Sequence, residues 1–307
     1  MSEASYTTLE TRPGTLWPLF RRSPLAIAAA TVTLLMVLGA ILAPLIAPQN
    51  PFDPAALDLA NALFPPSWVA GSDPRFLLGS DDQGRDVLSA LLYGSRISLL
   101  VGVAAVLFAA VIGVAVGLVA GYAGGWVDTL AMRLADVQLT IPSILIALMI
   151  DGLARAALPM AAHDAMAIYV LIFSIGIADW PQYARIVRTA TAVQKTLGYV
   201  SAARVMGVPA PVIVLRHILP NVLTSVLVLG TLGLALAIIA EATLSFLGVG
   251  MPPTAPSLGT LIRVGNNFLF SGEWWITLFP SLTLVVLALA VNMLGDWLRD
   301  ALNPKLK

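Results

Sequence analysis

Long apolar runs separated by polar loops dominate the hydrophobic pattern of the chain. A helix that crosses the hydrocarbon layer needs about 20 consecutive, mostly apolar residues. Six stretches meet this requirement, and the fifth is long enough to require tilt or an extension beyond the membrane. They are residues 24–47, 97–121, 134–158, 165–184, 218–248 and 275–298. The pattern predicts an all-α integral membrane protein with six transmembrane helices.

The first stretch also has features of a signal peptide, because Arg21 and Arg22 precede an apolar run. That run covers residues 25–46 and exceeds the usual signal core of about 7–15 residues. We therefore interpret it as an uncleaved membrane anchor.

Composition agrees with a membrane protein, since 58% of the residues are hydrophobic and 11% are charged. The mean hydropathy is +0.88. A soluble domain of this length needs more charge to cover its surface. The net charge of zero gives no reason to expect nucleic acid as a partner. The chain has no cysteine, and its two histidines, His163 and His217, are too far apart for a short metal motif. No metal or cofactor site is expected in this chain.

The distribution of basic residues predicts the orientation, because lysine and arginine favour the cytoplasmic side. With the N-terminus inside, 12 of the 17 basic residues fall on internal segments. Both termini are then cytoplasmic. The predicted regions are an internal N-terminal segment 1–23, the first helix 24–47, an external loop 48–96, a core 97–298 with an internal loop 185–221, and a tail 299–307.

The chain lacks the motifs of a self-sufficient pump or a membrane enzyme. There is no phosphate-binding loop, and Lys195-Thr196 lacks the preceding glycines. There is also no His-Glu-x-x-His motif and no Gly-x-Ser-x-Gly motif. We expect no catalytic residue, and any ATP hydrolysis must occur in a partner.

Few ionisable residues fall within the spans, where a central charge costs at least ~2.5–3.5 kcal/mol unless it is paired. Asp151 and Arg155 are four residues apart and are predicted to pair. Glu241 has two interpretations, a hydrogen-bonded packing group or a proton or ion site. Asp179 and Asp296 are expected near the cytoplasmic ends of their helices.

Glycines recur every fourth residue along the second predicted helix. This spacing lets two helix backbones approach closely in a membrane, so we predict a packing surface. The glycines are Gly113, Gly117, Gly121 and Gly125.

The internal loop contains a predicted short helix at residues 199–206, ended by Gly207. Its small side chains suit either a helix that lies in a groove of another protein or an ordinary amphipathic surface helix. Under the first interpretation, Ala203 and Gly207 allow the helix to lie deep in that groove.

An external segment, residues 79–86, combines glycines with charged residues. Gly79 and Gly84 permit tight turns, Asp81 or Asp82 can cap the following helix, and Arg85 can pair with an acid. A structural role and direct contact with a binding protein or solute are both compatible with this pattern.

Several of these segments resemble one family. The small residues 201–203, then Gly207 and residues 218–220, are similar to the EAA loop of binding-protein-dependent ABC importer permeases. Residues 78–90, 121–128, 244–250 and 292–304 resemble the dipeptide/oligopeptide permease group, which includes nickel and glutathione importers.

The resemblance implies a type I permease of the bacterial inner membrane that forms half of a translocation pathway. It also implies a homologous companion permease, two ATP-binding subunits that hold ATP and Mg, and a periplasmic or lipid-anchored solute-binding protein. In such importers, ATP binding closes the ATPase pair and moves docked coupling helices. The implied coupling-loop residues are Tyr199, Ser201, Ala202, Ala203, Arg204, Gly207, Val208 and Pro220. The implied periplasmic gate or structural residues are Gly79, Asp81, Gly84, Arg85 and Asp86.

Two positions depart from the family pattern. Ser201 stands where the loop motif opens with an acidic residue, and Ala90 stands where the group often has a basic one. The alternative class is an ATP-independent channel or secondary carrier, against which the coupling loop argues. Peptide is the group's commonest cargo, but the matched motifs concern architecture and coupling.

Overall fold

Helices make up most of the chain, and the computed structural model describes residues 16–53 and 57–302. The predicted internal residues Arg12, Lys305 and Lys307 lie outside this part. In chain order the α-helices are α1 Leu16–Arg21, α2 Pro24–Ile46, α3 Val87–Ala123, α4 Gly125–Leu139, α5 Ser143–Ala157, α6 Met160–Lys195, α7 Gly198–Val205, α8 Ala210–Val212, α9 Leu219–Phe246, α10 Leu258–Asn266 and α11 Trp275–Leu302. Short 3₁₀ turns lie at Leu59–Asn61 and Leu269–Ser271, and a π-helical segment, η4, covers Ile213–Ile218.

Five helices are long and apolar enough to cross a membrane, and the α4–α5 pair makes a sixth if it is one span. The five are α2, α3, α6, α9 with the segment before it, and α11, which correspond to five of the predicted stretches. The central helix α3 begins at Val87, not at residue 97, because Asp86 caps it by accepting the Ser89 N–H at 2.8 Å.

The third predicted span, residues 134–158, is not one straight helix. The chain breaks at Thr140–Pro142, and α4 and α5 meet at an angle of 90°. Pro142 has no N–H and restricts Ile141 to extended backbone, so α4 ends before this pair. Pro142 then occupies the N-cap of α5. Hydropathy identifies an apolar run here but does not show that the chain bends within it.

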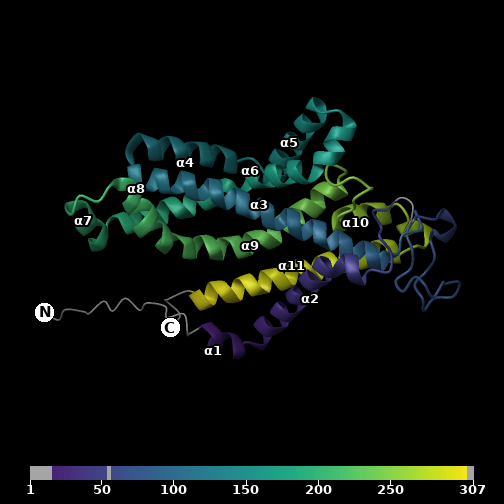
Figure 1. The fold of residues 1–307 in the computed structure, drawn as a ribbon. Helices are drawn as coiled ribbons and strands as arrows, with labels where there is room; N and C mark the ends of the chain where they lie inside the picture. The colour runs from purple at the N-terminus through teal and green to yellow at the C-terminus, as the bar shows by residue number, and fades with distance from the viewer. Residues whose placement is uncertain (1–15, 54–56, 303–307) are drawn as a thin grey trace.

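The helices form a bundle whose two ends differ (Figure 1). The segment α7–α8 lies at one end, and α10 lies at the other with the loop before α3. Along one side, α2 runs next to α11, while α3, α6 and α9 form the centre. The centre contains buried apolar residues such as Val101, Leu171 and Leu244.

Three glycines of α3 bring it into backbone contact with α6. A Cβ on Gly113 would lie 2.8 Å from the Trp180 carbonyl oxygen. One on Gly117 would lie 2.6 Å from the Ala184 carbonyl oxygen, and one on Gly121 would lie 2.7 Å from that of Arg188. The contact therefore depends on side chains that are missing from α3.

Gly125 does not belong to this packing surface, which corrects the prediction for the fourth glycine. A Cβ there would meet nothing within 4 Å. Gly124 and Gly125 have φ of 69° and 57°, and the chain turns here from α3 into α4. The four-residue glycine spacing continues in the sequence beyond Ala123, the last residue of α3, and there it no longer places residues on one face of that helix.

Gly117→Ala tests the α3–α6 contact. We expect a loss of about 1–3 kcal/mol of stability, because the added methyl group overpacks against the α6 backbone. The measurement is thermal unfolding of the purified chain in detergent. The matched control is Gly152→Ala in α5, where a Cβ meets nothing within 4 Å. Equal unfolding temperatures for the two variants would show that α3 and α6 do not touch at Gly117.

Candidate functional site

The segment between α6 and α9 carries the predicted coupling loop. It consists of the short helix α7, a turn at Gly207, the single turn α8 and the π-helical η4. Figure 1 shows α7 projecting at one end of the bundle. The predicted helix at residues 199–206 is present as Gly198–Val205.

The helix α7 has an inner and an outer face. Val200 and Ala203 are buried and pack in a cluster that includes Val187 of α6 and Ile213 of η4. Ser201, Ala202 and Arg204 are exposed on the other side. Val205 and Met206, at the tip, are 89% and 74% exposed. An exposed apolar tip on an otherwise anchored helix is typical of a docking surface.

The hypothesis that Ala203 faces a groove of another protein is wrong. Ala203 is only 4% exposed and faces the chain's own core. Its small size lets α7 lie close to α6 and η4 instead. The predicted loop residue Val208 is half-buried and packs against the same cluster.

Gly207 ends α7 through a Schellman motif. Its φ is +77°, a left-handed conformation that favours glycine. The Gly207 N–H donates to the Arg204 carbonyl and the Val208 N–H donates to the Ala203 carbonyl, each at 3.0 Å. A Cβ on Gly207 would meet nothing within 4 Å, so this residue is also open to a partner.

Polar contacts fix α7 to the bundle. Lys195, at the end of α6, first ties α6 to α3 where α7 begins, because its Nζ donates to the Tyr122 carbonyl oxygen at 2.6 Å and lies 5.6 Å from the centre of the Tyr122 ring. The Arg204 guanidinium lies over the same ring at 5.3 Å. The Tyr199 hydroxyl donates to Gln194 Oε1 at 2.6 Å. The sequence predicts no contact for Lys195 or Tyr122, although Tyr122 lies within residues 121–128, one of the segments that carry the resemblance.

Pro220 coincides with the change of helical register between η4 and α9. It has no N–H to donate. The preceding Leu219 N–H bonds to the Val214 carbonyl five residues back, as in a π-helix. The Asn221 side chain donates to the His217 carbonyl oxygen at 2.7 Å, so this irregular turn is satisfied internally.

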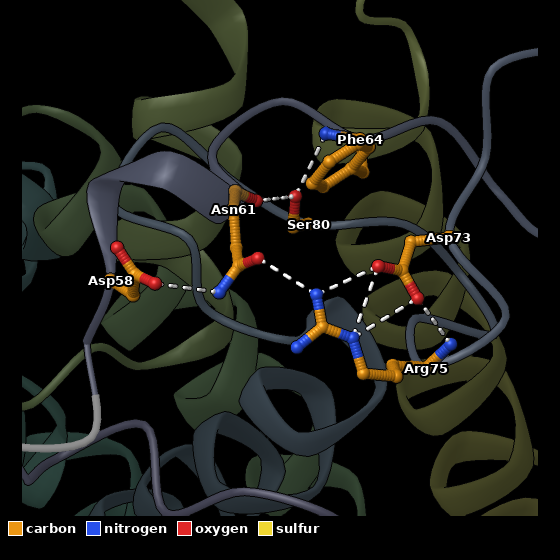
Figure 2. A network of polar contacts seen from close by, with 6 residues as sticks. All are labelled: Asp58, Asn61, Phe64, Asp73, Arg75 and Ser80. Atoms are coloured by element: carbon orange, nitrogen blue, oxygen red, sulfur yellow. Dashed lines mark hydrogen bonds and ion pairs between the residues drawn. The ribbon is translucent and has the colours of Figure 1, made fainter.

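At the opposite end of the bundle, side chains hold the loop before α3 in shape (Figure 2). The Ser80 hydroxyl donates to the Asn61 carbonyl oxygen at 2.6 Å and accepts the Phe64 N–H at 2.8 Å. Arg75 donates to Asn61 Oδ1 at 2.9 Å and pairs with Asp73. The hydrogen bond from Arg75 holds the pKa of Asp73 below its usual value.

Arg85 is the buried centre of this loop. It is 1% exposed, and its Nε lies 2.6 Å from Asp81 Oδ2, which confirms the predicted pairing with an acid. Its Nη1 donates to the Pro253 carbonyl oxygen at 2.9 Å. Asp82 is more peripheral, and burial followed by the neighbouring Asp81 charge raises the pKa of its carboxyl.

The prediction that Asp81 or Asp82 caps the next helix is wrong, because Asp86 caps α3. Asp81 instead accepts the Gln83 and Arg85 N–H groups, each at 2.9 Å. At Gly79 and Gly84, φ is 86° and 74°. A Cβ on Gly84 would lie 2.2 Å from the Asp58 carbonyl oxygen. The buried positions of Ser80, Asp81, Arg85 and Asp86 favour the structural interpretation of this motif.

The two fully buried acids of the spans, Asp151 and Glu241, have partners within the chain. Asp151 Oδ2 accepts Arg155 Nε at 2.7 Å, as predicted. Glu241 is fully buried and accepts the Ser98 and Ser245 hydroxyls, each at 2.7 Å. These hydrogen bonds favour the packing interpretation of Glu241 over an ion site. Across the described ranges, no group of three or more His, Cys, Asp or Glu residues could hold a metal ion.

A bundle of several candidate membrane spans with an anchored, apolar-tipped helix outside it is the architecture expected of a membrane permease. Comparisons with known proteins make this specific. Residues 113–307 match the family described as binding-protein-dependent transport system inner membrane component. Residues 15–66 match the N-terminal transmembrane domain of oligopeptide transport permease C. The chain belongs to this permease family, and it is a multi-pass protein of the bacterial inner membrane.

Curated relatives match over almost the whole chain. The dipeptide transport system permease protein DppC of Haemophilus influenzae is 38% identical over 95% of this chain and 94% of its own length. The glutathione transport system permease protein GsiD of Pectobacterium atrosepticum is 38% identical over 95% and 90%. Family membership favours the importer permease over the ATP-independent channel or carrier.

A solved structure supports the fold. A chain of the inward-facing MetNI methionine ABC transporter aligns with a TM-score of 0.54 at 19% identity. The alignment covers 69% of this chain and 96% of that chain. The type I permease fold expected from the resemblance is therefore confirmed.

Arg85→Met tests the loop before α3. We expect a loss of about 3–5 kcal/mol of stability, because the Asp81 carboxylate stays buried without its partner. The control, Arg75→Met, removes an arginine whose side chain is 64% exposed, and we expect little change. The measurement is thermal unfolding in detergent. If both variants unfold like the parent chain, the Asp81–Arg85 pair does not hold the loop.

Proposed function

We propose that this chain forms half of the translocation pathway of an ATP-driven, binding-protein-dependent importer. The observation that carries the proposal is the anchored helix α7, whose tip exposes Val205 and Met206 in a chain of this permease family. The remaining parts are a homologous companion permease, two ATP-binding subunits and a periplasmic or lipid-anchored solute-binding protein. ATP and Mg belong to the ATP-binding subunits.

Di- or oligopeptides, or a related small solute, are the proposed cargo. Support comes from relatives named for dipeptide, di/tripeptide and glutathione transport. The solute-binding protein delivers the cargo, and this chain provides a wall of the pathway.

The geometry suits α7 as a coupling helix. Its contacts with Tyr122, at the end of α3, and with Gln194, at the end of α6, tie it to two central helices. A displacement of α7 by the ATP-binding subunits would therefore move α3 and α6. Gly207 and the outer residues Ser201 and Ala202 complete the surface offered to those subunits.

The orientation completes the proposal. We place both ends of the chain and α7 in the cytoplasm and the loop before α3 in the periplasm. Supporting this, Arg21, Arg188, Lys195, Arg204 and Arg299 all lie on segments assigned to the cytoplasmic side.

Val205→Asp tests the docking surface. The side chain is exposed, so the permease itself should keep its stability, but a charge in the apolar contact should exclude the ATP-binding subunits. We expect co-purification of those subunits and transport to fall at least about tenfold, which corresponds to about 1.4 kcal/mol of binding. The measurements are subunit ratios in the purified complex and ATP hydrolysis stimulated by loaded binding protein.

Ser201→Glu is the matched control. It also adds a negative charge to the outer face of α7, but where the family pattern carries an acid, so coupling should remain. Full stimulation of ATP hydrolysis in Val205→Asp would reject α7 as the coupling element.

Single cysteines in this cysteine-free chain test the orientation. An impermeant thiol reagent added to intact cells should label Ser72→Cys and leave Arg204→Cys unlabelled until the membrane is opened. Labelling of Arg204→Cys from outside would reverse the proposed topology.

A further inference from the structure

The break between α4 and α5 is fastened to the middle of α6. Pro181, inside α6, has no N–H to donate to the Ile177 carbonyl four residues back. The side chain of Gln138, in the last turn of α4, donates to this carbonyl instead. Gln138 Oε1 in turn accepts the Trp180 indole N–H at 3.0 Å. The end of α4 is thereby held beside α6 at this level, and α5, which begins four residues further on, also packs against α6.

A small cleft lies next to this junction, between α5, α6 and α9. Its volume is about 10 Å³, which is room for one water-sized group. Its lining consists of Ser143, Ile144, Ala147, Ile175, Ala178, Asp179, Ala240 and Leu244.

Asp179 is the only acid in that lining, and it differs from the other acids of these helices. Among the described residues it has no hydrogen-bond or ion-pair partner. Other acids of α4, α5 and α9 are paired, and neighbouring arginines of α6 are already engaged. The pairs are Asp128 with Arg188, Asp136 with Arg185, Asp151 with Arg155, and Glu241 with Ser98 and Ser245.

The position of Asp179 within a predicted membrane span makes the lack of a hydrogen-bond or ion-pair partner unusual. It lies near the middle of α6, about 28 Å from Met160 and about 24 Å from Lys195 at 1.5 Å per residue. The proposed orientation assigns the last part of α6, residues 185–195, to the cytoplasmic side, so Asp179 lies about 9 Å inside the predicted span. A carboxylate at this depth is costly unless it is paired or lines a water-filled path. The two interrupted helix ends beside it match the way membrane transporters build solute sites.

We propose that Asp179 binds the primary ammonium group of the solute as it passes between α5, α6 and α9. This rests on the proposed function, because it places the cleft on the translocation pathway. The cleft suits an ammonium group, which is compact and carries three donors. Asp179 and the Ser143 hydroxyl supply acceptors, and the cleft has room for the ammonium group itself.

The same geometry disfavours other cations. A divalent metal needs several hard ligands, whereas the lining holds one carboxylate. A planar guanidinium favours bidentate pairing and is larger than the cleft. A quaternary ammonium favours an aromatic cage, and no aromatic side chain lines the cleft.

Thiol labelling at Ser143→Cys tests the site without knowledge of the cargo. The probes are two methanethiosulfonates of similar size, one carrying a primary ammonium and one a sulfonate. They are applied to the complete solubilised transporter, and modification of this chain is measured by mass. We expect Asp179→Asn to lower the ratio of ammonium to sulfonate modification by about tenfold. Asp164→Asn, which changes a half-exposed acid at the start of the same helix, should leave the ratio unchanged.

Transport gives the second readout. Uptake of L-alanyl-L-alanine into proteoliposomes should fall at least about tenfold in Asp179→Asn, with partial rescue by Asp179→Glu. Stimulation of ATP hydrolysis by the binding protein should persist. If the parent transporter does not take up this dipeptide, the peptide cargo of the proposed function fails, and the labelling ratio alone decides the site.

Two results would overturn the assignment. One is a labelling ratio at Ser143→Cys that does not depend on Asp179, including the case in which no reagent enters. The other is loss of the companion permease from the purified Asp179→Asn complex, which would show that Asp179 pairs with a residue of that subunit.

Discussion

The close contact between α3 and α6 is the constraint on which the rest of this structure depends. Lipid gives two apolar helices little reason to associate, so the attraction must come from dense packing between backbones. Gly113, Gly117 and Gly121 supply that packing. Every functional element described above is attached to one of these two helices. Asp86 starts α3, Tyr122 ends it beneath Arg204, and α6 carries both Asp179 and the support for α7.

Most of the fold was predictable because a segment that crosses lipid must be apolar over about 20 residues, and hydropathy detects such segments directly. The sequence also contained the signal for the break at Ile141-Pro142, but the apolar residues on both sides concealed it. Hydropathy shows that a segment is apolar enough to lie in lipid, but it does not show whether the chain bends within that segment. The early start of α3 was hidden for a related reason, since its first turns pack mostly against protein and contain polar residues, the buried Ser89 and the exposed Arg96.

Roles in the candidate site were predictable for residues whose role depends only on their own backbone conformation. Gly207 ends α7 because glycine tolerates the left-handed conformation, which is visible in the sequence. Which face of α7 points inward is decided by residues far along the chain, such as Ile213, and so Ala203 was assigned to the wrong side. The same holds for the three acids near Arg85. Which one caps α3 depends on where the helix begins, and that is settled by contacts with Gln49 and Ser89.

The loop before α3 has a consequence for how the protein is made. The Ser80 carbonyl accepts the indole N–H of Trp275, which follows it by 195 residues. Arg85 bonds to Pro253, which follows it by 168 residues. At about 5–20 residues per second, a ribosome needs roughly 8–34 s to reach that proline after the arginine. During this interval the loop lacks two of its supports, so it must remain soluble and escape proteolysis until α11 has been synthesised. Its prolines and charged side chains favour solubility over that interval. The loop reaches its final structure only after Trp275 of α11 has been synthesised.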